Sequence, residues 1–257
     1  MKLTADYHTH TIYSDGKNTV LENALAADEV GLKEIAITEH GYSHWFRGLK
    51  RSETTAWLEE IAEADKQTNV KVLRGMECNI RGVSGLCDFT ESDYENFDVF
   101  LAGIHVVIRY EHFSDRELGW SGWRRRLVGM KPSSSLLRDT TKAFVNAIEK
   151  NPIDIITHLN FQCFADVVEV AKCCSDDGTY LEISSKKEHL TDEELADIVA
   201  KTEVKFIVNS DGHFTSRIGD CTLAEKQILR VGVPLERIVN VDGKLPTFRF
   251  AEFKKHM

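Results

Sequence analysis

The sequence predicts an α/β protein in which parallel strands alternate with helices. Seven short runs rich in β-branched residues are separated by longer stretches with helical periodicity. This repeated order makes the strands parallel to one another and packs the helices outside them. Seven such units fit either a closed barrel or an open doubly wound sheet. Both architectures place functional residues at the carboxyl ends of the strands.

The predicted strands are short runs rich in Val, Ile and Leu. They cover residues 3–10, 33–38, 70–78, 98–104, 153–158, 179–184 and 204–209. No Gly-rich phosphate-binding motif, G-x-G-x-x-G or G-x-x-x-x-G-K-[ST], follows any of them. The sequence therefore gives no indication of the nucleotide-binding open sheets.

Helical patterns lie between the strands, and one of them has a well-defined start. Thr191 can cap its amino end with Glu194 three residues later, which is a capping box, and Leu190 and Leu195 occupy the flanking hydrophobic positions. Gly31 follows the first helix, where a left-handed residue commonly ends a helix. The predicted helices cover residues 19–30, 53–67, 134–149, 165–174, 192–201 and 222–231.

Residues 106–133 fit neither pattern. The segment carries Trp120 and Trp123, three consecutive arginines (Arg124, Arg125 and Arg126) and Lys131. A long irregular segment beside a strand end is commonly a lid or a substrate-binding loop. A surface helix with a solvated arginine face is the alternative, and both interpretations stay open.

Length and composition point to one soluble domain spanning residues 1–257, without linker or internal repeat. Acidic residues number 41 and basic residues 32, which gives a net charge of −9. An acidic surface disfavours binding to nucleic acid or to anionic membranes. No apolar run is long enough to cross a membrane, and Asp6 interrupts any secretory signal at the amino end. The six cysteines form no C-x-x-C pair, so we expect a reduced, cytoplasmic protein.

Histidines and carboxylates gather at the ends of six predicted strands. Side chains at positions i and i+2 of a strand share a face, so His8 and His10 point the same way, as do Asp211 and His213 if that strand stays extended. Imidazole and carboxylate without thiolate suit Zn²⁺, Fe²⁺ or Mn²⁺. The donors are too many for one ion, so we expect a multinuclear centre rather than a buried polar cluster without metal. The residues are Asp6, His8, His10, Glu39, His40, Glu77, His105, His158, Asp211 and His213.

Seven motifs together resemble the PHP (polymerase and histidinol phosphatase) family over nearly the whole chain. They are DYHTHTIYSDG (6–16), AITEHG (36–41), LRGMECNI (73–80), AGIH (102–105), ITHLN (156–160), LEISS (181–185) and NSDGH (209–213). The resemblance implies a single-domain distorted (βα)7 TIM-like barrel. It also implies three divalent metal ions, Zn, Fe or Mn with mixed occupancy allowed, at the strand carboxyl ends.

The resemblance also implies a set of metal ligands. They are His8, His10, Asp15, His40, Glu77, His105, His158, Asp211 and His213. The chain departs from the family pattern at Glu39, where aspartate is usual, and at Leu159, where proline is usual. We expect Asp6 to face the same side as His8 and to accept a hydrogen bond from a ligand imidazole, with an N-terminal ion pair as the alternative. Glu182 either supports the site in the same way or is structural.

The implied reaction is phosphoester hydrolysis by a metal-bridging hydroxide. Protonation of the leaving alkoxide would come from a metal-bound water or from a free histidine such as His44. Arg81, Arg109 and Arg217 each follow a ligand closely and are candidates to bind the substrate phosphate, with Arg47 less close. The acidic net charge does not oppose a phosphorylated substrate, because bound divalent ions dominate the local field.

A small phosphomonoester is therefore the expected substrate, and L-histidinol phosphate is one candidate. The alternatives are a nucleotide phosphatase, a 3'-5' exonuclease-like phosphodiesterase, and a non-catalytic metal-binding regulatory module. A phosphotyrosine-protein phosphatase is also compatible and would need an open rim around the site. No nucleic-acid or membrane partner is expected.

Overall fold

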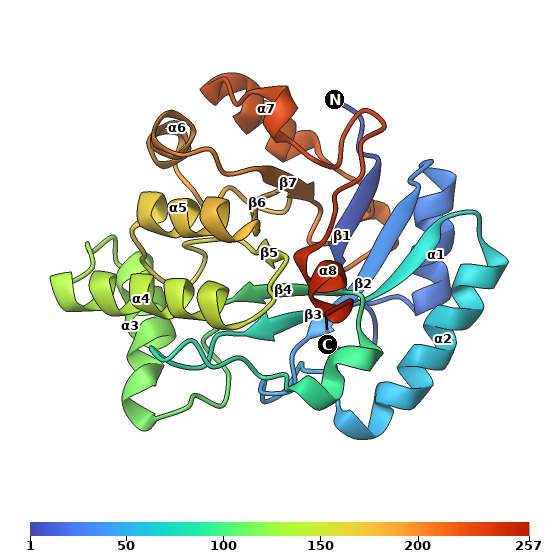
Figure 1. Cartoon of the computed structure of the whole chain (residues 1–257), viewed down its shortest axis with the longest axis horizontal. Coiled ribbons are helices and arrows are strands. Elements are labelled where there is room, and N and C mark those ends of the chain that lie inside the picture. The colour runs from blue at the N-terminus through green and yellow to red at the C-terminus, as the bar shows by residue number, and fades with distance from the viewer. Residues whose placement is uncertain (257) are drawn as a thin grey trace.

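Seven parallel strands form the centre of the computed structural model, which describes residues 1–256 (Figure 1). Each strand pairs with the next one along the chain, in the order β1 to β7. The strands are β1 (Ala5–Thr9), β2 (Glu34–His40), β3 (Lys71–Asn79), β4 (Val99–Gly103), β5 (Ile155–Ile156), β6 (Tyr180–Ser184) and β7 (Phe206–Asn209).

The sheet curls until its first and last strands meet. Thr9 forms a parallel bridge with Gly212, the backbone N–H of His10 donates to the carbonyl of Gly212, and the N–H of Gly212 donates to the carbonyl of His8. These contacts lie only at the carboxyl ends, and β5 is two residues long, so the barrel is nearly closed and distorted. The predicted barrel is confirmed, and the open doubly wound alternative is wrong.

Helices surround the strands on the outside (Figure 1). All six predicted helices are present, and the structure adds α3 and α8. The helices are α1 (Val20–Glu29), α2 (Thr54–Gln67), α3 (Arg116–Leu127), α4 (Ser134–Lys150), α5 (Val167–Asp177), α6 (Asp192–Lys201), α7 (Thr222–Val231) and α8 (Arg249–Lys254). The predicted capping box of α6 is confirmed: the N–H of Glu194 donates to Thr191 Oγ1 at 3.1 Å, and the N–H of Thr191 donates to Glu194 Oε2 at 2.8 Å. Gly31 has the left-handed conformation expected at a helix end, with φ of 76°.

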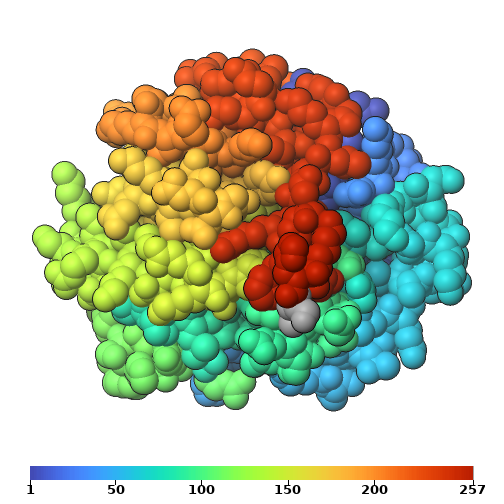
Figure 2. All heavy atoms as spheres, in the orientation of Figure 1, coloured from blue at the N-terminus to red at the C-terminus, as the bar shows by residue number. Residues whose placement is uncertain are grey.

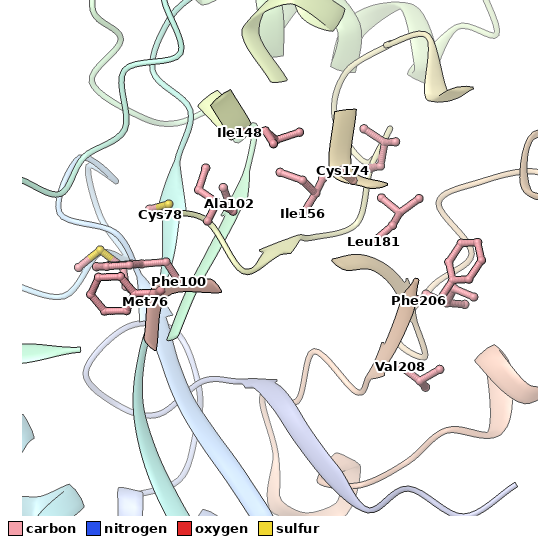
Figure 3. Close-up of a cluster of buried hydrophobic side chains, with 14 of the residues drawn as sticks. Met76, Cys78, Phe100, Ala102, Ile148, Ile156, Cys174, Leu181, Phe206 and Val208 are labelled. Atoms are coloured by element: carbon pink, nitrogen blue, oxygen red, sulfur yellow. The ribbon is translucent and has the colours of Figure 1, made fainter. Parts of the chain in front are cut away.

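Alternation along the strands divides the buried side chains into two layers. The outer layer packs between strands and helices, and Figure 3 shows part of it, including Met76, Cys78, Phe100, Ala102, Ile156, Leu181, Phe206 and Val208, with Ile148 of α4 and Cys174 of α5. The inner layer fills the barrel with Ala5, Tyr7, Ala36, Val99, Leu101, Ile155, Tyr180 and Ile207. Glu77 lies between Met76 and Cys78 in β3, so this alternation turns its carboxylate inward.

The C-terminal segment closes one end of the barrel. Phe248 packs edge-on against Tyr7 with ring centroids 4.9 Å apart. The buried carboxylate of Asp154 accepts the backbone N–H of Phe250 at 2.8 Å and that of Phe100 at 2.9 Å. In the space-filling view this segment occupies the middle of the face (Figure 2). The barrel is therefore filled from this end, and the polar side chains gather at the other.

Of the two interpretations left open for the segment 106–133, the structure favours a surface helix over an irregular loop. Its centre is helical, with a short 3₁₀ turn at Phe113–Asp115 leading into α3. Arg124 is exposed, but the half-buried Arg126 donates from Nε to the carbonyl of Cys163 at 3.0 Å. The sequence left this helix open as an alternative because its outward face carries arginines and its inward face carries two glycines, so it has no clear apolar stripe.

Across residues 1–256, no helix has the length and apolar character needed to cross a membrane. All six cysteines are unpaired, as the sequence predicts.

Candidate metal centre

The carboxyl ends of the strands bring all nine candidate ligands to one end of the barrel. His8 lies within β1 and Glu77 within β3, while His40 is the last residue of β2. The others lie on the segments that leave β1, β4, β5 and β7, and they are His10, Asp15, His105, His158, Asp211 and His213. Eight of the nine are buried or half-buried. They form four overlapping groups of three, and within each group the donor atoms lie within 4.8 Å of one another. Asp15 lies beside two of these groups, next to His40 and His213.

Glu77 is the centre of this arrangement. Its carboxylate is fully buried and is surrounded by the nitrogens of five histidines. The distances are 2.6 Å for His158, 2.7 Å for His40, 3.1 Å for His105 and 3.5 Å for both His8 and His10. A single carboxylate at the meeting point of five imidazoles is suited to bridging two cations.

Two further carboxylates flank Glu77. Asp211 Oδ1 lies 3.6 Å from Nε2 of His10 and 3.3 Å from Nδ1 of His213. Asp15 Oδ1 lies 3.1 Å from Nε2 of His213 and 3.4 Å from Nε2 of His40. The nine side chains therefore form one continuous cluster rather than separate sites.

An irregularity in β1 explains how two histidines reach the barrel interior. The register between β1 and β2 shifts between Asp6 and Thr9. Tyr7 lies in the inner layer, yet His8 also faces inward onto Glu77, so the regular alternation breaks at this point. A β-bulge has this effect, because one extra residue re-aims the side chains that follow.

The same irregularity corrects the contact predicted for Asp6. Because Asp6 precedes the break, it faces away from His8 and accepts no hydrogen bond from an imidazole within residues 1–256. Its carboxylate instead accepts the backbone N–H of Ser210 at 3.1 Å and that of Gly219 at 3.0 Å, with a longer contact of 3.4 Å to the N–H of His8. Asp6 thus fixes the backbone that leads to Asp211, rather than the tautomer of a ligand.

Two candidate ligands sit on strained backbone. His158 has φ of 27° and Asp211 has φ of 48°, values that L-residues rarely adopt. The backbone N–H of His158 donates to Glu182 Oε2 at 2.8 Å, which helps to hold this conformation. Such strain persists where surrounding contacts over-determine the geometry, and it clusters at functional sites.

Buried hydrogen bonds orient the histidines. Glu182 Oε1 lies 2.8 Å from Nδ1 of His8, which leaves Nε2 of that ring directed at Glu77. Asn79 Oδ1 lies 2.8 Å from Nδ1 of His105, and the amide nitrogen of Asn79 donates to Asp88 at 2.6 Å. Partners of this kind fix the tautomer of metal-binding histidines.

Sequence reasoning left Glu182 undecided and missed Asn79 altogether. The position of Asn79 in the sequence could have indicated its role, because Asn79 is the last residue of β3, the strand that carries Glu77. Glu39 was noted only as a departure from the family pattern. It is buried and accepts hydrogen bonds from the hydroxyls of Thr11 and Ser14, which hold the loop that presents Asp15.

The electrostatics of the cluster favour anionic carboxylates. Burial alone would raise the pKa of Glu77, but His105, His40 and His8 outweigh this and hold it well below its usual range. Burial and the neighbouring His40 and His213 lower the pKa of His10, so this ring is neutral and able to bind a cation. Burial also lowers the pKa of His40, but Glu77 and Asp15 dominate and raise it to about 10.

The donor atoms themselves show that the cluster fits metal ions. Six of them are buried without a hydrogen-bond partner, namely His8 Nε2, His10 Nε2, Asp15 Oδ1, His40 Nδ1, Glu77 Oε2 and His105 Nε2. Unpaired buried polar atoms are costly, and here they point at one another across short distances. Divalent cations between them would satisfy these atoms, so the residues present fit a site for several metal ions.

A cavity of about 550 Å³ opens directly above the cluster. Its floor is formed by candidate ligands, and Arg47 and Lys186 are the cations that line it. Arg47 Nη1 lies 3.0 Å from Asp15 Oδ2, and Lys186 Nζ lies 3.1 Å from Asp211 Oδ1. Positive charge in the cavity is therefore placed beside the cluster.

The three arginines predicted to bind phosphate do not line this cavity. Arg81 and Arg109 line a separate, smaller hollow, where Arg81 Nε donates to the carbonyl of Arg109 at 2.8 Å. Arg217 lies in a neighbouring groove, bonded to Asp220 and to the carbonyl of Ser185. Closeness in sequence to a ligand misled the prediction, because the chain turns outward after each of the three strand ends.

His44 does line the cavity, and its ring stacks on His40 with centroids 5.2 Å apart. Burial, reinforced by His40 and His105, lowers the pKa of His44 to about 3. The proton-donor role suggested for His44 from the sequence stays a prediction.

Comparison with known proteins gives one family and a consistent set of relatives. A family model described as the PHP domain matches residues 6–218. A protein named "Probable phosphatase" from Clostridium botulinum is 28% identical over 255 residues, covering 93% of this chain and 91% of the relative. A "Probable phosphatase" from Thermoanaerobacter sp. is 29% identical over 264 residues, covering 96% of this chain and 95% of the relative.

Solved structures share the fold. Histidinol phosphate phosphatase from Lactococcus lactis, described in complex with zinc, L-histidinol and phosphate, superposes with a TM-score of 0.60 at 16% identity, covering 96% of this chain and 97% of that one. A structure described as a putative histidinol phosphatase from Listeria monocytogenes has a TM-score of 0.57 at 13% identity, covering 84% of this chain and 97% of that one. At these identities the likeness concerns the fold.

Proposed function

The chain belongs to the PHP domain family and is a phosphatase, a hydrolase of phosphoric esters, and on this premise we propose that it hydrolyses a small phosphomonoester at a trinuclear metal site. The observation that carries the proposal is the convergence of nine candidate ligands, with the buried Glu77 at their centre, beneath a small cavity. The four groups of donors share members, as ligands of adjacent ions would.

The nature of the donors supports transition metals. Neutral imidazoles and carboxylates without thiolate suit Zn, Fe or Mn, and no ion of this kind takes nine ligands. Divalent ions held here would activate a water at neutral pH and polarise the phosphate oxygens. The nine candidate ligands would hold the metal ions, and Glu182 and Asn79 orient two of them, His8 and His105.

Lys186 and Arg47 are the proposed phosphate-binding side chains, in place of Arg81, Arg109 and Arg217. Both reach the cavity beside a candidate ligand. Cationic donors next to the metal ions would hold the non-bridging oxygens of the phosphate and stabilise the charge that these oxygens carry during hydrolysis.

The cavity favours a small substrate over a polynucleotide. It is within the usual range for pockets that bind small molecules, and α3 forms one of its walls. The net charge of −9 also disfavours a long polyanion across the surface. L-Histidinol phosphate is a reasonable first substrate to test, since the Lactococcus lactis protein is described with L-histidinol and phosphate.

The test is to purify the protein without chelator and to measure phosphate release from a panel of sugar, amino-alcohol and nucleotide monophosphates. We expect turnover that chelator abolishes and that Zn, Fe or Mn restores. His8→Ala should lose activity, while His256→Ala, which changes an exposed histidine outside the barrel end, should retain it. Full activity in His8→Ala, or no hydrolysis of any monoester by the metal-loaded protein, would overturn the proposal.

A further inference from the structure

The walls of the cavity differ sharply from its floor. Above the candidate ligands, the apolar side chains that line it are Phe46, Val106, Val107, Trp120, Trp123 and Phe161. Among the described residues, the cations that line it are Arg47 and Lys186, and each contacts a carboxylate of the metal cluster. Charge is thus concentrated at the phosphate end, and the remainder of the substrate meets apolar and aromatic surface.

Trp120 and Trp123 form a corner in one wall. They lie one helical turn apart on α3, with ring centroids 5.9 Å apart and an interplanar angle of 89°. Each keeps 39% of its surface exposed, so both rings can be reached from the cavity that they line. Two perpendicular indole rings offer both a face for stacking and an edge for a T-shaped contact.

Two glycines fix this corner in place. A Cβ at Gly119 would lie 2.4 Å from the hydroxyl of Tyr110, and one at Gly122 would lie 2.7 Å from Cα of Cys163. Helix α3 therefore approaches the backbone of Gln162 and Cys163 so closely that position 122 requires glycine, and a side chain at position 119 would displace the Tyr110 hydroxyl. The tryptophans are held on a docked helix, so the aromatic wall is formed before the substrate binds.

One polar group completes the wall. Gln162 Oε1 accepts the backbone N–H of Val106 at 2.8 Å, which fixes the orientation of this amide. Its NH₂ group has no hydrogen-bond partner in residues 1–256 and is available to one acceptor on a ligand. Arg47 and Lys186 are the only cations among the described residues that line the cavity, so none is left to pair with a second anionic group of the substrate.

From these features we infer that the leaving group of the substrate carries a planar aromatic ring, which packs into the corner formed by Trp120 and Trp123. The inference rests on the proposed phosphomonoesterase activity and narrows it to arylalkyl or aryl phosphates without a second anionic group. An aliphatic sugar phosphate would bury its hydroxyls against apolar walls that return few hydrogen bonds.

The test compares phosphate esters whose alkoxide leaving groups are chemically alike. The metal-loaded protein is assayed with 2-phenylethyl phosphate, 2-cyclohexylethyl phosphate, butyl phosphate and glycerol 1-phosphate. We expect kcat/KM for 2-phenylethyl phosphate to exceed the values for the other three by about tenfold, as one well-placed aromatic contact can supply. Equal kcat/KM values for the phenyl and cyclohexyl esters would overturn the inference while leaving the phosphatase activity established.

Variants locate the preference in the corner. Trp120→Ala with Trp123→Ala should remove the advantage of the phenyl ester, mainly through KM, while inhibition by inorganic phosphate stays within about twofold because phosphate occupies the metal end. Trp45→Ala is the matched control, since Trp45 is 63% exposed and does not line the cavity.

Gly122→Ala, which displaces α3, should weaken the same preference for the phenyl ester. A phenyl-ester advantage that survives in both the double variant and Gly122→Ala would overturn the assignment, and no hydrolysis of any ester would instead refute the proposed function.

Discussion

The carboxylate of Glu182 lies 2.8 Å from Nδ1 of His8, deep in the barrel and without exposed surface on either side chain. The other carboxylate oxygen accepts the backbone N–H of His158. One residue of β6 therefore orients two candidate ligands, one by its imidazole and one by its strained backbone. Because Glu182 also accepts from the amide of Asn209, its two oxygens are held by neighbouring strands.

Replacing Glu182 should weaken metal binding without removing a ligand. In Glu182→Gln, an amide replaces the carboxylate that orients His8, and we expect metal affinity to fall about 10- to 100-fold. Competition titration with a chromophoric chelator measures this affinity. Glu59→Gln, an exposed change on α2, serves as the control. An unchanged affinity in Glu182→Gln would show that the contact does not position the ligand.

Lys186 is expected to bind substrate rather than metal. Lys186→Met keeps the length of the side chain but removes the charge, and KM should rise about tenfold or more because a charge-assisted contact to phosphate is lost. Metal content measured by elemental analysis should stay at the wild-type level. Arg81→Met, outside the cavity, should leave KM unchanged. If Arg81→Met raised KM and Lys186→Met did not, the original arginine prediction would be restored.

The metal-free protein should become less stable as pH rises above neutrality. Its His40 has a pKa of about 10 when folded, against an ordinary value of 6.5, because Glu77 and Asp15 outweigh the effect of burial. A raised folded pKa contributes stability that is complete below pH 6.5 and is lost as pH rises toward 10. The pKa of His8 is raised as well, through Glu182, Asp211 and Glu77 against the effect of burial, so it acts in the same direction.

Urea unfolding in the presence of chelator, at several pH values from 6 to 10, measures this loss. Each unit of pKa shift corresponds to about 1.4 kcal/mol. His40→Gln should flatten the pH dependence of the free energy of unfolding. A stability that is constant or rises over this range in the unmodified, metal-free protein would contradict the assigned charges.

The capping box of α6 should contribute measurably to stability. Thr191→Ala removes the side-chain acceptor for the N–H of Glu194, and we expect the free energy of unfolding to fall by about 1 kcal/mol. Thr191→Ser keeps a hydroxyl at the cap and should retain most of that stability. Urea unfolding of both variants under the same metal-free conditions compares them, and equal losses would show that the hydroxyl is not the cause.

Strand and helix periodicity predicted the fold well because local pattern and tertiary packing agree here. Met76 and Cys78 alternate with Glu77, so a single strand pattern specifies both the outer core and the inward carboxylate. The capping box of α6 was readable for the same reason, since its hydrogen bonds are local. Eight of the nine candidate ligands could be gathered from sequence because strand ends converge in a barrel whatever the details of its loops. Asp15 lies beyond a strand end and came only from the resemblance to the PHP family.

Other features depended on contacts that no local pattern encodes. Because of the break in β1, the side chains of Asp6 and His8 point in different directions, which strand alternation alone cannot reveal. Arg81 and Arg217 follow ligands closely in sequence but turn away in space. Helix α3 packs through close glycine contacts and not through an apolar stripe, which is why the sequence could not decide between a helix and an irregular loop. Asn79 contacts the candidate ligands through His105, a partner 26 residues away in sequence.

The central claim is that Glu77 joins the nine side chains into one multi-metal centre, and metal content in Glu77→Gln tests it most directly. The change is isosteric but removes the charge that faces five imidazoles. Elemental analysis of protein purified without chelator should find about three transition-metal ions per chain in the wild type and at least one fewer in the variant, with phosphatase activity lost. Equal metal content and activity in the two proteins, or a wild type without transition metal, would contradict the account.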